Sequence, residues 1–283
     1  METGHESQTA ITVCTGRALA HGATSVGRFT DPTALNLLPP AARARVESIR
    51  AGTAATSVGE RLKRAHLAGL SKMMVARTVA IDDALRSVQS PQVVILGAGL
   101  DGRAWRMPEL RDRVVFEVDH PDSQRTKRER SASLSPVARD IRFVPVDFER
   151  DRLDDALAAA GHDPARATTW IWEGVVMYLT KADVEATLAV IARRSSLGSR
   201  LIAAYHSPAL KLRLATLFGP FPGEPLRSTF TPEAMHALLS RHGFDVVQDD
   251  DICAIGATLS ADIGRATRLA KHLRIVTADH RRS

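Results

Sequence analysis

Cysteine and aromatic residues are scarce in this chain of 283 residues. The two cysteines, Cys14 and Cys253, lie far apart and neither belongs to a C-x-x-C pair, which argues against a disulfide framework or a cysteine-based metal site. We therefore predict that both are plain small apolar residues and that the chain binds no metal. Aromatic residues make up 5% of the chain, too few to suggest a surface on which nucleic-acid bases would stack.

Long apolar runs are also missing. No stretch of about eighteen apolar residues occurs, although 44% of the residues are hydrophobic, so we expect no membrane span. The first six residues, Met1 to Glu6, have neither the basic start nor the apolar block of a signal peptide. Together these absences predict a cytoplasmic protein.

The formal net charge of +6 comes almost entirely from arginine, because the chain has only six lysines. The densest basic cluster runs from Arg125 to Arg130, shortly after Pro121, where a helix should begin. It has almost no apolar face, and neither aromatic residues nor a recognition motif accompany it. We interpret this cluster as part of a solvated helix and expect no nucleic-acid partner.

What the chain does contain is an apolar strand from Pro91 that runs into a glycine turn. Gly97, Gly99 and Gly102 fit G-x-G-x-x-G, and Asp119 follows about twenty residues later, as in a dinucleotide-binding turn. However, Asp101 lies inside the turn, where it would place negative charge beside the pyrophosphate of a dinucleotide. The turn therefore favours a cationic nucleotide.

Carboxylates also end the following strands. Asp119, Asp147 and Glu173 each follow an apolar run, and in an open parallel sheet the ligand lies outside the carboxyl ends of the strands. Several carboxylates without an obvious phosphate-binding lysine suit S-adenosylmethionine, which is positively charged and has no phosphate. The alternative is that these acids simply cap the next helix.

Four motifs in this order resemble the leucine carboxyl methyltransferase family, in particular its bacterial branch of S-adenosylmethionine-dependent methyltransferases common in actinobacteria. The resemblance covers roughly residues 70 to 280. Its motifs are Val-Ile-Leu-Gly97-Ala98-Gly99-Leu-Asp101-Gly-Arg103, Phe-Glu117-Val-Asp119-His-Pro121, Val-Pro-Val-Asp147-Phe148, and Trp-Glu173-Gly174-Val-Val-Met-Tyr178-Leu179. It implies a class I methyltransferase: an α/β fold with a Rossmann-like, mostly parallel sheet of seven strands.

We expect residues 1–90 to form an N-terminal extension and helical cap. The first 30 residues should order poorly or lie along the surface, and helices follow from Thr30 to Leu38, from Ala41, and over 57–86, packed across the ligand edge. Residues 91–283 should form the cofactor-binding core, in which strand and helix patterns alternate. A helical lid is expected over about 206–230, after the fifth strand, with an ordinary core-covering helix as the alternative.

The glycine turn predicts the first cofactor contacts. Gly97, Ala98 and Gly99 let the backbone pass close to the ligand, although a tight strand-to-helix turn alone would also need the glycines. Asp119 can accept hydrogen bonds from both ribose hydroxyls. We prefer it to Glu117, which lies further from the strand end and could be a supporting acid or the partner of a buried arginine.

Asp147 and Phe148 are expected to bracket the adenine, unless Asp147 caps the helix near Arg152. The resemblance implies that Arg77 binds the methionine carboxylate, with Arg103 in reserve, because the planar guanidinium matches a carboxylate. A surface contact with the acids downstream is the plain alternative for Arg77.

Glu173, with Gly174, should accept from the methionine ammonium or hold the turn. Tyr178 should reach the cofactor or the acceptor with its hydroxyl, or else be a core tyrosine with a satisfied hydroxyl.

These features predict an O-methyltransferase that transfers the sulfonium methyl to a carboxylate or hydroxyl of a small molecule, such as a secondary metabolite. A carboxylate needs no base, whereas an alcohol or phenol benefits from one, and His206 is the candidate; a structural histidine is the alternative. Two other functions stay open: a nicotinamide-dependent oxidoreductase, and a non-catalytic module that binds S-adenosylmethionine.

Overall fold

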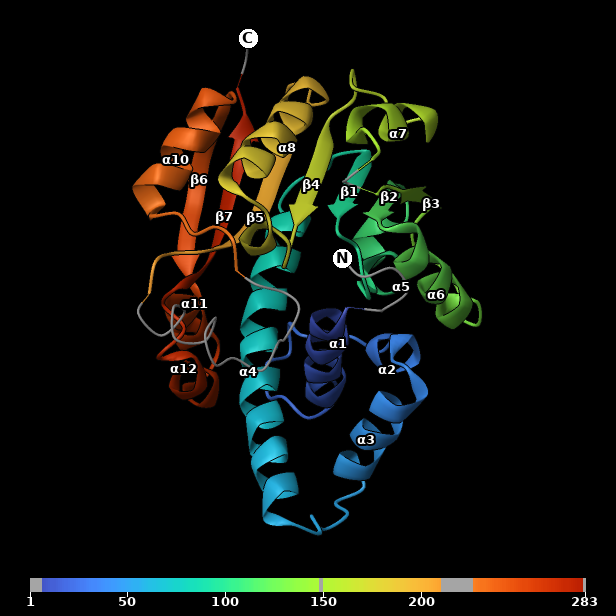
Figure 1. Cartoon of the computed structure of the whole chain (residues 1–283), viewed down its shortest axis with the longest axis vertical. Coiled ribbons are helices and arrows are strands. Elements are labelled where there is room, and N and C mark those ends of the chain that lie inside the picture. The colour runs from blue at the N-terminus through green and yellow to red at the C-terminus, as the bar shows by residue number, and fades with distance from the viewer. Residues whose placement is uncertain (1–6, 148–149, 210–225, 282–283) are drawn as a thin grey trace.

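The protein is built around a seven-stranded sheet with helices on both faces (Figure 1). The computed structural model describes residues 7–147, 150–209 and 226–281. The strand order is β3-β2-β1-β4-β5-β7-β6. The strands are β1 (Gln92–Leu96), β2 (Val114–Asp119), β3 (Asp140–Pro145), β4 (Thr168–Trp172), β5 (Arg200–His206), β6 (Phe244–Asp251) and β7 (Leu273–His280).

The position of strand β7 distinguishes this sheet from the sheet of a dinucleotide-binding domain. Strands β3, β2, β1, β4 and β5 pair in parallel, and β7 is inserted antiparallel between β5 and β6. A dinucleotide-binding domain has strand order 3-2-1-4-5-6. The mostly parallel, seven-stranded sheet expected from the sequence is therefore confirmed.

The central strands are apolar throughout because helices cover both of their faces. Every residue of β1 and β4 is buried, as parallel strands between two helical layers require. One face packs against α7 (Leu153–Ala159), α8 (Lys181–Arg193) and α10 (Pro232–Arg241). The other packs against α4 (Val58–Arg86), α5 (Arg103–Arg106), α11 (Ile252–Leu259) and α12 (Ala261–Thr267).

Helix α4 is the long helix expected over 57–86. Ser57 caps it, because the Ser57 hydroxyl accepts a hydrogen bond from the backbone N–H of Glu60 at 3.1 Å. Its carboxyl-terminal half is buried and carries Arg77 to the sheet. The remaining helices are α2 (Ala34–Leu37), α3 (Pro40–Arg50), α6 (Pro121–Ser131) and the short helices η1 (Pro108–Leu110) and η2 (Val176–Tyr178).

The expectation that the first 30 residues order poorly or lie along the surface is wrong for α1 (Gln8–Ala20). Ser7 caps this helix, and Cys14, Arg17 and Ala18 are buried in it. Helix α1 packs against α4 below the carboxyl ends of the strands (Figure 1). Helices α2 and α3 begin close to the two starts expected near residues 30 and 41, although α2 is shorter than predicted.

The chain after β5 is fixed beside the sheet at both ends of the expected lid. The backbone N–H of Ser207 donates to the carbonyl of His272 at 2.7 Å, and that of Phe230 donates to the carbonyl of His206 at 2.9 Å. The middle of the expected lid, residues 210–225, lies outside the described residues, so the lid stays a prediction, as does the boundary at residue 90. Within the described ranges, no helix combines the length and apolar character needed to cross a membrane.

Candidate active site

The turn after β1 requires glycine at two positions. Gly97 and Gly99 have φ angles of 66° and 41°, in the left-handed region. A Cβ atom on Gly97 would lie 2.3 Å from Cγ2 of Val175, so the position also lacks space for a side chain. Between them, the N–H of Ala98 donates to the carbonyl of Val118 at 2.9 Å and ties the turn to β2.

Asp119, at the end of β2, contacts this turn. Its Oδ2 accepts from the backbone N–H of Gly99, and its Oδ1 accepts from the N–H of His120 at 2.7 Å. Burial raises the pKa of Asp119, and these backbone donors oppose that rise. Each carboxylate oxygen can accept a further hydrogen bond, so Asp119 retains capacity for ribose hydroxyls.

Glu173 brings together both arginines proposed for the methionine carboxylate. Its Oε1 lies 2.7 Å from Nε of Arg77, and its Oε2 accepts from Nη1 of Arg103 at 2.9 Å. Burial alone would raise the pKa of Glu173, but Arg77 and Arg103 lower it. Glu173 is therefore ionised at neutral pH.

The two arginines differ in how many protein acids they pair with, and therefore in their capacity to bind a ligand. Arg103 also donates from Nε to Asp82, at 2.8 Å, and from Nη1 to Asp101, so its guanidinium is shared among three acids. Among the described residues Arg77 has a single ion pair, with Glu173, in which Nε of Arg77 lies 2.7 Å from Oε1. Arg77 is thus the better candidate for a ligand carboxylate, and the alternative of a surface contact is wrong because Arg77 is buried.

Asp101 is not the uncompensated charge that the turn sequence suggests. Burial alone would raise its pKa, but Arg103, Lys127 and Arg17 lower it well below the usual range of a carboxyl group. Its negative charge is therefore balanced within the protein. The charge of Asp101 is therefore a weaker argument against dinucleotide binding than the sequence indicates. The strand order of the sheet is the stronger argument against it.

A chain of buried ion pairs extends from Glu173 to the N-terminal segment. It has equal numbers of cations and anions, and the longest contact in it, between Arg106 and Asp31, is 3.9 Å. The members are Arg17, Arg77, Arg103 and Arg106 with Asp31, Asp82, Asp101 and Glu173. The chain links α1, α4, the turn and β4 across the site.

Sequence reasoning missed the contribution of α1. Arg17 donates from Nη2 to the carbonyl of Leu100 at 2.6 Å, and Ala10 lies against Gly99. The hydroxyl of Tyr178, which follows the left-handed Gly174 (φ 73°), lies 3.4 Å from that of Thr9. Apolar residues spaced by four, Ala10, Cys14 and Ala18, were the signal that could have revealed this helix.

Glu117 is the partner of a buried cation, but of a lysine rather than an arginine. Nζ of Lys127, from α6, lies 2.7 Å from Oε2 of Glu117, and both side chains are excluded from solvent. The interpretation of residues 125–130 as a solvated helix holds for Arg125 but is wrong for Lys127.

Asp147 follows β3 in a turn of its own. Its backbone carbonyl accepts from the N–H groups of Arg150 and Asp151, and its carboxylate lies 3.7 Å from Nε of Arg150. The residue that caps α7 is Arg152, which makes no side-chain capping hydrogen bond. Phe148 lies outside the described residues.

His206 ends β5 as a buried neutral imidazole. Its ring centroid lies 5.6 Å from that of His272, and its Nδ1 has no hydrogen-bond partner among the described residues. Burial, together with His272 and Arg77, lowers the pKa of His206 to about 4. The imidazole is therefore neutral at pH 7, and its Nδ1 is the ring atom that could bind a ligand.

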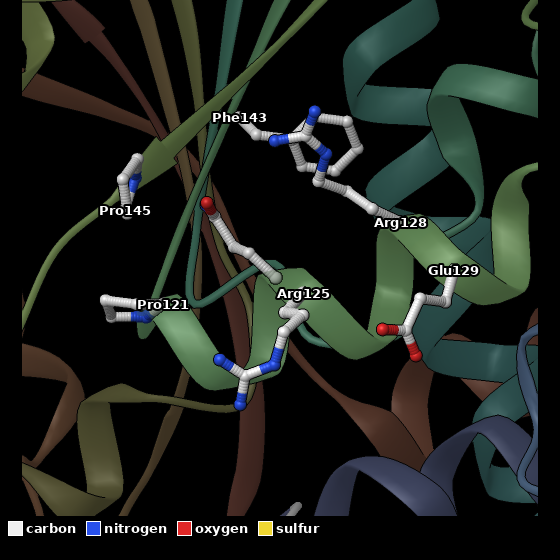
Figure 2. A pocket seen from close by; sticks show the side chains of 7 residues that line it. Pro121, Arg125, Arg128, Glu129, Phe143 and Pro145 are labelled. Carbon is white, nitrogen blue, oxygen red and sulfur yellow. The ribbon is translucent and has the colours of Figure 1, made fainter.

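A surface pocket of about 420 Å³ lies between α6 and β3, away from these residues. Figure 2 shows that residues of α6, among them Pro121, Arg125 and Arg128, and Phe143 and Pro145 of β3 line it, with Arg128 over the ring of Phe143. None of the predicted site residues lines this pocket, so the candidate site is the edge formed by the carboxyl ends of β1, β2, β4 and β5.

Comparison with known proteins agrees with this arrangement. Residues 10–192 match the family model of leucine carboxyl methyltransferases. The chain belongs to this family. Its similar relatives include a protein from Mycobacterium sp. (strain JLS), 39% identical over 147 residues, which are 51% of this chain and 49% of that protein. Another, from Frankia alni, is 38% identical over 177 residues, 61% of this chain and 59% of that protein.

The names of both relatives describe them as inferred S-adenosyl-L-methionine-dependent methyltransferases, and the match spans about half or somewhat more of their length.

Among solved structures, a duf574 family protein from Streptomyces avermitilis aligns over 98% of both chains with a TM-score of 0.53 and 12% identity. A geranyl diphosphate C-methyltransferase from Streptomyces coelicolor aligns over 82% of this chain and 86% of that one, with a TM-score of 0.53 and 15% identity. These two similarities concern the fold alone.

Proposed function

We propose that this protein is an S-adenosylmethionine-dependent O-methyltransferase whose acceptor is the carboxylate of a small molecule. Family membership and the names of the relatives support the cofactor and the reaction. A neighbour of the same fold, the geranyl diphosphate C-methyltransferase, acts on a small molecule, as we propose here. A small-molecule hydroxyl is the second candidate acceptor.

The site residues fit S-adenosylmethionine. Gly97, Ala98 and Gly99 would let the ligand approach the backbone, and Asp119 would accept from the ribose hydroxyls. The terminal nitrogens of Arg77 are the donors that a methionine carboxylate needs. Glu173 is ionised and would attract the ammonium group beside Gly174.

Asp147, and Phe148 beside it, would read the adenine, and Tyr178 would contact the cofactor or the acceptor. When bound, S-adenosylmethionine supplies a methyl group activated by its sulfonium. The protein would contribute mainly position, and α1, which contacts the turn at Gly99 and Leu100, would help to exclude water.

The surroundings of His206 favour a carboxylate over a hydroxyl as the acceptor. A general base works best when its pKa lies near the operating pH, and the pKa of His206 is lowered to about 4. No carboxylate contacts its ring within the described part of the chain; its charged or titratable neighbours are His272 and Arg77. A neutral imidazole can instead donate one hydrogen bond to an acceptor carboxylate and hold it in place.

A carboxylate acceptor needs no proton transfer. One of its oxygens forms the new bond to the methyl carbon while the bond from that carbon to sulfur breaks, and sulfur retains the electron pair. The products are a methyl ester and neutral S-adenosylhomocysteine. Positioning alone therefore suffices for catalysis.

A labelled-methyl screen tests this function. The protein is incubated with S-adenosylmethionine labelled in the methyl group and with matched carboxylic acids and phenols, and each product is then treated with alkali. A methyl ester releases labelled methanol, whereas a methyl ether does not. Alkali-stable products would overturn the carboxylate assignment, and cofactor binding without transfer to any acceptor would favour the non-catalytic module.

A further inference from the structure

Lys127 belongs to a surface helix but points into the protein. Its side chain is 1% exposed, and its Nζ pairs with Glu117 and lies 5.3 Å from the ring centroid of Trp105, next to the glycine turn. Arg125, on the same helix, is 66% exposed and faces the surface pocket (Figure 2). A fully buried lysine needs a reason, because removing an ammonium group from water is costly.

The acids around Lys127 suggest that reason. Glu117 and Asp119 alternate along β2 and so lie on one face of it. Burial raises the pKa of both, to about 7 for Glu117, and Lys127 acts to lower both. Asp101 also faces Lys127, but it has a cation of its own in Arg103.

The other titratable groups nearby do not replace Lys127. His120 donates its backbone N–H to Asp119, and its ring lies 3.7 Å from Asp122, at the surface. On the α1 side the neighbour is Cys14, whose thiol is neutral because burial raises its pKa to about 12. Among the described residues Asp119 has no ion pair, so Lys127 is the main buried cation that acts on it.

We propose that Lys127 is a positioning residue that keeps Asp119 ionised for cofactor binding, while Glu117 takes up the first proton that enters this buried cluster. Asp119 accepts two backbone hydrogen bonds that favour its ionised form. Oε1 of Glu117 has no hydrogen-bond partner among the described residues, so Glu117 is the easier acid to protonate. Once Glu117 is neutral, the charge of Lys127 still favours the ionised form of Asp119, while Asp101 keeps its pair with Arg103. This inference rests on the proposed function, in which Asp119 binds the ribose.

The test compares Glu117→Gln with the double variant Glu117→Gln/Lys127→Met, and measures S-adenosylhomocysteine binding by calorimetry at pH 6 and pH 8.5. Replacing a whole buried pair by neutral residues is often tolerated, so the double variant should fold. At pH 6 it should bind about tenfold more weakly than Glu117→Gln, because without Lys127 a larger fraction of Asp119 is protonated at that pH and cannot bind the ribose as a carboxylate. At pH 8.5 the difference should narrow, since Asp119 ionises in both variants.

Two further variants distinguish the effect of the Lys127 charge on affinity from the effect of its packing. Lys127→Arg in the Glu117→Gln background retains the charge and should restore most of the affinity at pH 6. Arg125→Met removes a basic residue from the same helix at an exposed position and should bind like the unmodified protein at both pH values.

Equal affinities of Glu117→Gln and the double variant at pH 6, or a loss of the same size at both pH values, would show that Lys127 only fills space and would overturn the inference. Failure of the unmodified protein to bind either S-adenosylmethionine or S-adenosylhomocysteine would overturn the proposed function as well. Should the methionine variant not fold, Lys127→Gln in the same background provides the same comparison.

Discussion

Replacing Arg103 by methionine should destabilise the protein strongly, because Arg103 connects three buried acids. Its side chain is 3% exposed and pairs with Asp82, Asp101 and Glu173. In the variant, Asp82 keeps its pair with Arg106 at 2.7 Å, and Glu173 keeps its pair with Arg77. Asp101 loses its only ion pair among the described residues.

The expected loss in the free energy of unfolding follows from Asp101, the one acid that is left without an ion pair. Breaking a buried ion pair from one side costs about 3–5 kcal/mol at neutral pH. In the unmodified protein the folded-state pKa of Asp101 is depressed, so the stability it contributes is present above its unfolded pKa, near 4, and is lost only below that value. In the variant, Lys127 and Arg17 still oppose the effect of burial, but the loss of Arg103, the largest opposing charge, should raise the pKa of Asp101. The cost should then shrink as the pH falls through the raised pKa, by up to about 1.4 kcal/mol for each pH unit.

Urea unfolding of the ligand-free protein at pH 5 and pH 8 measures this cost. Adding Asp101→Asn to Arg103→Met removes the unpaired charge and should recover part of the stability. Arg125→Met is the matched control: it breaks an exposed pair with Asp122 and should cost less than about 1 kcal/mol. A loss below about 1 kcal/mol for Arg103→Met, or one that is the same at both pH values, would refute the reasoning.

Three predictions concern the cofactor and the reaction. Asp119→Ala should weaken S-adenosylhomocysteine binding by about 1.5–3 kcal/mol in calorimetry, because the ribose loses a charged acceptor; an unchanged Kd in a folded variant would remove Asp119 from the site. Arg77→Lys should retain binding better than Arg77→Met, which loses both charge and donors, and equal affinities of the two would exclude contact with the methionine carboxylate. His206→Ala should lower turnover only by what positioning contributes, with a flat rate between about pH 6 and 8. A fall of about 10²–10⁴-fold with intact cofactor binding would instead identify His206 as a base and the acceptor as a hydroxyl.

The sequence predicted the fold, and the carboxylates that gather at one edge of the sheet could be recognised in it, because these signals are local. Each strand is a short apolar run, and Gly97, Asp119 and Glu173 follow their strands directly, so parallel pairing alone brings them to one edge. The family predicted from the four motifs is confirmed as well. The roles assigned to individual residues stay predictions.

The partners of buried charges could not be predicted, because ion pairing depends on which segments meet in space. Nothing in the sequence distinguishes Lys127, which is buried against Glu117, from its exposed neighbour Arg125. The pair of Arg17 with Asp31 was hidden in the same way, since small residues around Arg17 suggested a poorly ordered segment. The charge of Asp101 was recognised, but its neutralisation by Arg103 was not.

The hydrogen bond from Arg17 to Leu100 joins residues 83 positions apart in the chain, and it has a consequence for the order of folding. A helix of 13 residues such as α1 is only marginally stable by itself. Although α1 is synthesised before α4 and the turn, it gains its stability from them, and the ribosome releases them later. Contacts that close so long a loop form slowly, because the loss of chain entropy precedes the gain in contact energy. Helix α1 is therefore expected to be among the last parts to fold, and its docking completes one side of the candidate site.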